Sequence, residues 1–149
     1  MTDLDKYKHY ADRIKIFHGL EPEEVSDILH HGKILHFRAG ETVFHEGQLG
    51  SNLFVLLSGT VSIFKKTKLI AKLQVGDAFG EMAVLNKKPR NATAAADTDA
   101  KLFTLDERQI NNILEKHVAV RLLLNIVHVL SERLETANVL ITDLRKQVG

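Results

Sequence analysis

The sequence predicts a mainly β fold, a sandwich, roll or barrel of short strands with helices at both ends of the chain. Between residues 32 and 80, short apolar runs alternate with glycine-containing turns. Regular spacing of this kind is typical of all-β folds rather than of βαβ units. Before residue 32 the apolar residues recur at helical spacing, and from residue 106 neither glycine nor proline occurs before the last residue.

Residues 1–31 are expected to form the helical entry to this fold. Apolar residues recur three positions apart in two stretches, Ile14 with Phe17 and Val25 with Ile28. This spacing places their side chains on one face of a helix. Pro22 stands near the start of the second stretch, where a missing backbone N–H is tolerated. We therefore predict helices within this segment.

Residues 32–105 read as the β part of the fold. The apolar runs contain β-branched and aromatic residues, as strands do, and glycines occupy the turns between them. The predicted strands cover residues 33–38, 42–46, 53–57, 60–64, 68–73, 91–96 and 101–105.

Residues 106–148 are expected to form C-terminal helices, with Asp106 as the first N-cap. Beyond residue 119, apolar residues alternate in steps of three and four, as in a heptad seam. We call this set the seam: Val120, Leu123, Val127, Leu130, Leu134, Ala137, Ile141, Leu144 and Val148.

A second apolar row, the inner stripe, runs beside the seam through Leu122, Ile126, Val129, Arg133, Thr136 and Leu140. It becomes polar at Arg133 and Thr136. We interpret the inner stripe as packing on the chain's own strands and the seam as pairing with the helix of a second copy. The alternative is one wide apolar face against the protein's own body.

Length, charge and composition exclude several classes of protein. The chain has 149 residues, a length that predicts one domain over 1–149. Its formal net charge of +1 gives no bias toward nucleic acid and none against it, and we expect no nucleic-acid binding by this chain alone. Because cysteine is absent, disulfides, thiol catalysis and zinc–thiolate sites are excluded. The polar N-terminus and the lack of a long apolar run indicate neither a signal peptide nor a membrane span, so a cytoplasmic protein is expected.

One segment, residues 79–93, carries the chemistry. Gly80 precedes the apolar stretch EMAVL, and Glu81 and Arg90 flank that stretch. Glycine permits close approach of a ligand, and free amides at a helix start form an anion site. Arginine presents a planar fork to phosphate oxygens, and a carboxylate accepts from sugar hydroxyls. The segment therefore suits a sugar phosphate, with a structural Glu81–Arg90 ion pair as the alternative.

This segment resembles the phosphate-binding cassette of cyclic nucleotide-binding domains, the effector domains of catabolite-activator type. The matching anchors are Phe79, Gly80, Glu81, Ala83, Leu85, Pro89, Arg90 and Ala92. The resemblance extends over the whole chain, from IFHGLEPEEV through AGETVFHEGQLGSNLFVLLSGTVSIF to LLLNIVHVLSERL. It implies a β-roll, a double-stranded jelly roll, with N-terminal helices and a long C-terminal helix.

The resemblance also implies roles for single residues. Arg90 would bind the exocyclic phosphate oxygens, and Glu81 would accept from the ribose 2′-hydroxyl. Further positions follow by their place in the family pattern: the cradle at Gly80, Met82, Ala83, Asn91 and Ala92, the pocket wall at Ile63, Ile70 and Ala71, and the base-facing helix residues Arg133, Thr136 and Asn138.

Two positions depart from the family pattern. Ser51 stands where an acidic residue is common, after the glycine of a turn. Asn91 follows the cassette arginine, where threonine or serine favours cGMP and alanine is typical of cAMP sites. The purine preference is therefore left open between cAMP and cGMP, with cAMP expected to bind at least as well.

The function expected from these residues is regulatory binding of a cyclic mononucleotide, without a further cofactor. No nucleophile and base stand at workable spacing, so no enzyme is expected, and the histidines lack the spacing of a metal site. We expect a homodimer through residues 120–148. Because the predicted helix runs to the chain end, the output would lie in an unknown protein partner or a longer parent chain. The alternatives are a structural adaptor that no longer binds nucleotide and the sensory half of a transcription regulator.

Overall fold

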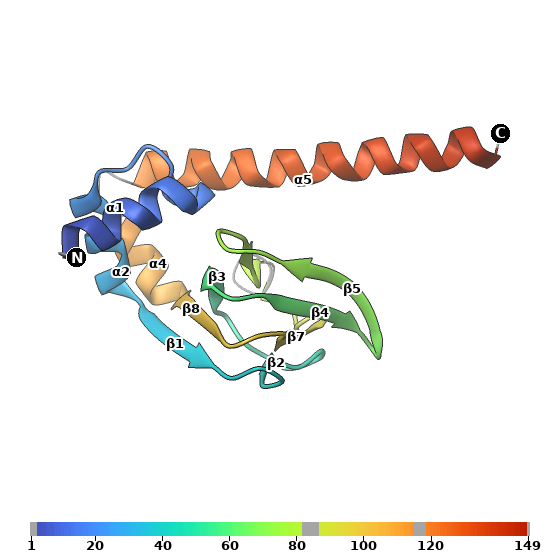
Figure 1. The fold of residues 1–149 in the computed structure, drawn as a ribbon, viewed down its shortest axis with the longest axis horizontal. Helices are drawn as coiled ribbons and strands as arrows, with labels where there is room; N and C mark the ends of the chain where they lie inside the picture. Colours follow the sequence, from blue (N-terminus) through green and yellow to red (C-terminus); the bar gives the residue numbers. More distant parts are fainter. Residues whose placement is uncertain (1–2, 82–86, 115–118, 149) are drawn as a thin grey trace.

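Two four-stranded antiparallel sheets form a β-roll, and helices cover one end of it (Figure 1). The computed structural model describes residues 3–81, 87–114 and 119–148. One sheet has the order β1-β8-β3-β6 and the other the order β2-β7-β4-β5. The strands are β1 Lys33–Phe37, β2 Thr42–Phe44, β3 Leu53–Ser58, β4 Val61–Lys65, β5 Lys68–Leu73, β6 Ala78–Phe79, β7 Thr93–Ala96 and β8 Ala100–Leu105.

Strands β3 and β8 separate two apolar cores. Because neighbouring side chains in a strand point to opposite faces, Val55 of β3 joins the core beneath the helices while Leu56 joins the core between the sheets. In β8, Phe103 joins the core beneath the helices and Leu102 joins the core between the sheets. The two strands pair with Val55 opposite Phe103 and Leu56 opposite Leu102. This register keeps each pair on one face of the sheet.

The helices before and after the roll meet at one end. They are α1 Asp3–Arg13, the single 3-10 turn η1 Lys15–Phe17, α2 Pro22–His31 and α4 Glu107–Leu114. The predicted Asp106 cap is confirmed, since the Gln109 N–H donates to Asp106 Oδ1 at 2.8 Å and the Asp106 N–H donates to Gln109 Oε1 at 2.8 Å. In α2, Glu21 and Glu24 cap the helix start reciprocally, with Pro22 in the first turn.

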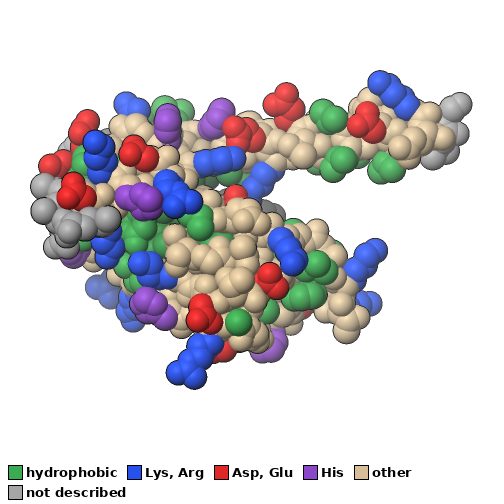
Figure 2. All heavy atoms as spheres, in the orientation of Figure 1, with side chains coloured by type: hydrophobic (Ala, Val, Ile, Leu, Met, Phe, Trp, Pro, Cys, Tyr) green, Lys and Arg blue, Asp and Glu red, His purple; other side chains and the backbone are tan. Residues whose placement is uncertain are grey.

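The last helix, α5 Ala119–Val148, contains 30 residues and is ~45 Å long. Its inner stripe begins on the protein body: Leu122 and Val129 are buried, and Ile126 packs against the same core. By contrast, the large side chains of the seam from Val120 to Leu144 are 38–67% exposed. The C-terminal part of α5 projects beyond the roll (Figure 1), with hydrophobic side chains on its surface (Figure 2).

The predicted β-roll with helices at both ends is confirmed, and the strand ends differ by up to two residues. The exception is β6, Ala78–Phe79, which was not expected as a strand. It pairs with β3 through Phe79 opposite Phe54. Two residues are too few to show an alternating pattern, so only the partner strand reveals it. The helical stretch expected around EMAVL lies outside the described residues.

Candidate functional site

A cavity of about 180 Å³ lies where β4, β6 and the segment before β7 approach α5. Both apolar and charged side chains line it. Its lining comprises Phe44, Ile63, Leu73, Ala78, Phe79, Gly80, Glu81, Pro89, Arg90, Asn91, Ala92 and Arg133.

Arg90 is the buried cation of this cavity, with 7% of its surface exposed. Its Nη1 donates to the Gly80 carbonyl at 3.0 Å and its Nη2 to the Asn52 carbonyl at 2.9 Å. The guanidinium carbon also lies 4.3 Å from the ring centre of Phe44, a cation–π distance. These neighbours hold the side chain in place but carry no negative charge.

No carboxylate of the described residues forms an ion pair with Arg90. Burial lowers the pKa of the Arg90 guanidinium, and the negative charge of Glu81 partly offsets that effect. Arginine nevertheless stays protonated at neutral pH. A buried cation without a paired anion is costly in free energy, so this site favours an anionic ligand.

Gly80 permits this placement of the arginine. Its φ is +81°, a backbone conformation that other residues rarely adopt. A Cβ at this position would lie 2.7 Å from Arg90 Nη1 and 3.0 Å from the Asn52 carbonyl oxygen. The glycine is therefore needed both for its backbone angle and for the space that Arg90 occupies.

The backbone at Arg90 is fixed by the loop that follows β2. The Gly47 N–H donates to the Arg90 carbonyl at 2.7 Å, and the Arg90 N–H donates to the Gln48 carbonyl at 2.9 Å. Asn91 and Ala92 follow directly and line the cavity. The loop thus pairs with the segment that presents these residues.

Helix α5 reaches the cavity through Arg133. Its Nη2 donates to the Ala78 carbonyl at 2.7 Å, and its Nη1 lies 3.5 Å from Glu81 Oε1. The polar interruption of the inner stripe therefore meets polar groups of the roll. Arg133 is thus the α5 side chain that, with Arg90, lines the cavity among the described residues.

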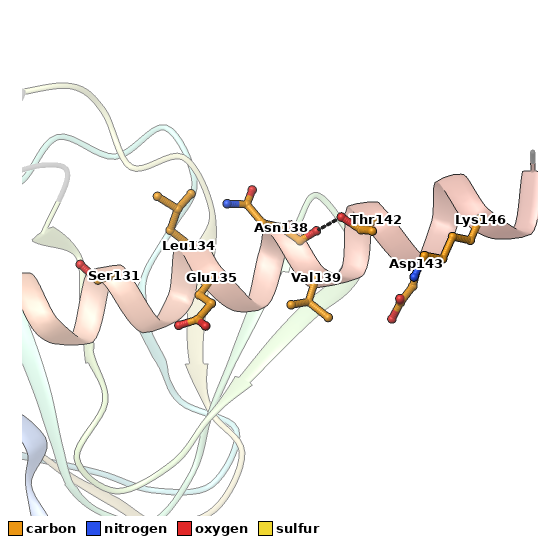
Figure 3. A pocket seen from close by; sticks show the side chains of 8 residues that line it. All are labelled: Ser131, Leu134, Glu135, Asn138, Val139, Thr142, Asp143 and Lys146. Carbon is orange, nitrogen blue, oxygen red and sulfur yellow. Dashed lines mark hydrogen bonds between the residues drawn. The ribbon is translucent and has the colours of Figure 1, made fainter.

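Thr136 and Asn138 do not line this cavity. The Thr136 hydroxyl donates to the Glu132 carbonyl one turn earlier, within α5. Asn138 borders a larger hollow of about 520 Å³ along α5 (Figure 3). Because one helix alone lines that hollow, nothing encloses a ligand there. The two residues face solvent in the single chain.

Among the predicted site residues, the structure gathers seven around the cavity and leaves others apart. Ile70 and Ala71 lie on the edge strand β5 and are exposed. The register of β4 with β5 shifts between Ile63, opposite Ala71, and Phe64, opposite Leu69, so Ile70 has no partner. Such a bulge re-aims side chains. Met82 and Ala83 lie outside the described residues. The seven are Ile63, Gly80, Glu81, Arg90, Asn91, Ala92 and Arg133.

Sequence analysis missed Phe44 and Asn52 as parts of the site. Phe44 was expected only as a strand residue, and its ring contacts Arg90. Asn52 contributes a backbone carbonyl, which every residue carries, so no side-chain pattern could have marked it. An aromatic residue at a strand end was the available signal for Phe44.

Two further searches concern the part of the chain that the structure describes. No group of three or more histidine, aspartate or glutamate side chains there is arranged to hold a metal ion. None of the described helices combines the length and apolar character needed to span a membrane.

Comparison with known proteins identifies the family. The model of the cyclic nucleotide-binding domain matches residues 34–117, which is more than half of the chain. The chain belongs to this family.

Individual relatives of this cyclic nucleotide-binding domain match it over part of their length. It is 32% identical over 108 residues to the cAMP-dependent protein kinase regulatory subunit of Hypocrea atroviridis, covering 72% of this chain and 23% of the relative. It is 36% identical over 95 residues to the cyclic AMP receptor protein of Thermus thermophilus, covering 60% and 44%. This chain thus spans less than half of either relative.

The fold comparison agrees. The crystal structure of the Thermus thermophilus catabolite activator protein superposes with a TM-score of 0.76 and 30% sequence identity, over 87% of this chain and 62% of that chain. The two-sheet roll with flanking helices and a long C-terminal helix is therefore the fold of a cyclic nucleotide-binding domain.

Proposed function

We propose that this domain binds a cyclic mononucleotide, with cAMP at least as tight as cGMP, and that binding acts as a regulatory signal rather than as a step of catalysis. The observation that carries the proposal is Arg90, a buried guanidinium held by neutral carbonyls on the wall of a cavity. Two relatives named for cAMP support the choice of nucleotide.

The ligand fits the cavity by its chemistry. The exocyclic oxygens of the cyclic phosphate would pair with Arg90 and with the N–H groups of Asn91 and Ala92, with Met82 and Ala83 completing the cradle. The ribose 2′-hydroxyl would donate to Glu81, whose carboxylate Arg133 also contacts. The purine would then extend along the apolar wall at Ile63 toward α5, where Arg133, Thr136 and Asn138 are our candidates for contact with the base.

Calorimetric titration tests this function. Wild type should bind cAMP, and Arg90→Leu should weaken binding by about 2–5 kcal/mol, the scale for removing one partner of a buried charged pair. Arg38→Leu removes the same charge from an exposed position outside the cavity and should leave the affinity unchanged. Equal affinity in wild type and Arg90→Leu would refute the role of Arg90.

A structural adaptor is the second candidate, and the exposed seam favours it. Its large apolar side chains are 38–67% exposed from Val120 to Leu144, and a continuous row of this kind is typical of a helix that pairs with another. We propose that a second copy of this chain covers the seam. No binding of nucleotide by wild type at millimolar concentration would leave dimerisation as the function of the domain.

The output of the signal is open to two proposals. Either a separate protein binds α5 and responds to its position, or a further domain of a longer chain does so, as in the sensory half of a transcription regulator. Because α5 contacts the cavity through Arg133 and projects beyond the roll, it is the element that we expect to carry the signal.

A further inference from the structure

Three segments meet outside the cavity at the Asn91 carbonyl. Lys65, the last residue of β4, donates from Nζ to this oxygen at 2.7 Å. Glu46, in the loop after β2, lies 3.7 Å from the same ammonium through Oε2. A charge-assisted hydrogen bond of 2.7 Å is short and strong for its class. The carbonyl is thus held by a charged side chain rather than by a strand partner.

The position of this carbonyl decides where the neighbouring N–H points. In a trans peptide, the oxygen of one residue and the N–H of the next lie on opposite sides of the chain. The Gly47 N–H holds the Arg90 oxygen, which directs the Asn91 N–H away from Gly47. Lys65 holds the Asn91 oxygen, which directs the Ala92 N–H away from Lys65. Within the described residues, neither N–H has a hydrogen-bond acceptor.

Glu46 keeps Lys65 in position through bonds of its own. Its Oε1 accepts the Lys66 N–H at 2.9 Å, and its own N–H donates to Thr93 Oγ1 at 2.9 Å. The bond from Lys66 lowers the pKa of Glu46 most, and the charge of Lys65 contributes to the lowering. The carboxylate is therefore ionised at neutral pH and fixes the hairpin end of β4 against the segment that follows Arg90.

We propose that Lys65 is a positioning residue of the anion site. It orients the Asn91–Ala92 peptide so that successive N–H groups are presented to the bound phosphate. The inference rests on the proposed function, because the anion in question is the cyclic phosphate. It adds to that function a side chain outside the cassette whose contact with the ligand is indirect.

Matched substitutions in one hairpin test the role. Lys65→Gln, which shortens the side chain and removes its charge, should lower the affinity for cAMP roughly tenfold. Lys65→Arg, which keeps a charged donor of similar length, should stay within about threefold of wild type. Lys68→Gln removes the same charge from the first residue of β5 and is the control. The apo unfolding temperature should be similar in all four proteins, which separates positioning from loss of fold.

Amide chemical shifts supply a readout that a purely structural bond would not move. In wild type, addition of cAMP or of inorganic phosphate should shift the Asn91 and Ala92 amide signals, and Lys65→Gln should abolish or reduce these shifts. An equal loss of affinity in Lys68→Gln, or unchanged shifts in Lys65→Gln, would overturn the proposal. If wild type fails to bind cAMP, the proposed function fails, while the phosphate titration still decides the role of Lys65.

Discussion

The two ends of the cavity are built differently. At the end around Arg90, which we propose to bind the phosphate and call the phosphate end, the Arg90 side chain is buried, donates to two backbone carbonyls and lies against an aromatic ring. The loop after β2 also pairs with its backbone. At the end facing α5, Arg133 is the one α5 side chain that lines the cavity among the described residues, and Thr136 is exposed. The first end is prepared before a ligand arrives, while the second is open.

This difference suggests that one end of the cavity sets the affinity for cyclic nucleotides and the other end sets the choice between them. A group already held in its binding geometry loses little conformational freedom when the ligand arrives. The phosphate end should therefore supply most of the affinity for any cyclic nucleotide. In the proposed complex, the end at α5 would contact the purine, the part in which these nucleotides differ, and the seam of the same helix is exposed.

The largest effect is expected from breaking the phosphate end at Gly80. Gly80→Ala places a Cβ 2.7 Å from Arg90 Nη1 and forces alanine to a φ of +81°, so we expect the affinity for cAMP to fall at least about thirtyfold, the scale of losing a buried charge contact. Calorimetry measures the loss. Gly40→Ala, at φ +89° with no atom within 4 Å, carries the same backbone strain and should reduce stability alone. Equal affinities in the two variants would contradict this account.

A second pair of substitutions tests whether the exposed seam of α5 pairs with the same helix of another copy. Leu134 and Ile141 of the seam are 64% and 49% exposed, and an aspartate buried in a helix–helix interface is strongly unfavourable. Leu134→Asp or Ile141→Asp should therefore convert a dimer to a monomer in light scattering at tens of micromolar.

Val139→Asp is the control for the dimer, since Val139 is 55% exposed on the same helix but outside the seam. Figure 3 shows Val139 pointing to the side of α5 opposite Leu134. This variant should remain a dimer. A wild type that is already monomeric under these conditions would exclude pairing through the seam.

A smaller effect is expected on the choice of base. cAMP and cGMP carry the same sugar phosphate, so only groups near the purine can tell them apart. The ratio of the two affinities should change in Arg133→Ala or Asn138→Ala by about five- to 150-fold, the range for one polar group left unpaired. If both helix variants keep the wild-type ratio and Asn91→Ala removes it, Asn91 reads the base instead.

The smallest effect concerns the attachment of α5 to the N-terminal turn. Lys15 Nζ lies 3.2 Å from Glu132 Oε2, and this hydrogen bond, with the charge of Lys15, lowers the pKa of Glu132. A carboxyl group whose pKa is lowered in the folded state stabilises the fold at pH values above its ordinary pKa. This contribution is lost as the pH falls through the lowered pKa.

Glu132→Gln should accordingly reduce the unfolding temperature at neutral pH by no more than about 2 °C, because exposed ion pairs contribute little. The difference from wild type should vanish in acid, where Glu132 is protonated. A difference that persists or grows on acidification would assign the effect to another contact. Thermal unfolding followed by circular dichroism across this pH range makes the measurement.

Much of this protein follows from local patterns in the sequence. The strands between residues 33 and 105, the Asp106 cap and the two rows of α5 depend on residues a few positions apart, where spacing fixes which side chains share a face. The motif around Gly80 and Arg90 likewise predicted that these two residues belong to one site, and both line the same cavity. These features are set by the chain's own periodicity and by the chemistry of single side chains.

Only the tertiary structure decided how the site is assembled. The Asn52 carbonyl that holds Arg90, the contact of Arg133 with Glu81 and the bulge that removes Ile70 from the wall each depend on register between segments distant in sequence. A one-residue shift of a strand turns its side chains to the other face. Spacing along the chain therefore determined which residues are suited to the site, and the packing of the two sheets against α5 determined which of them meet.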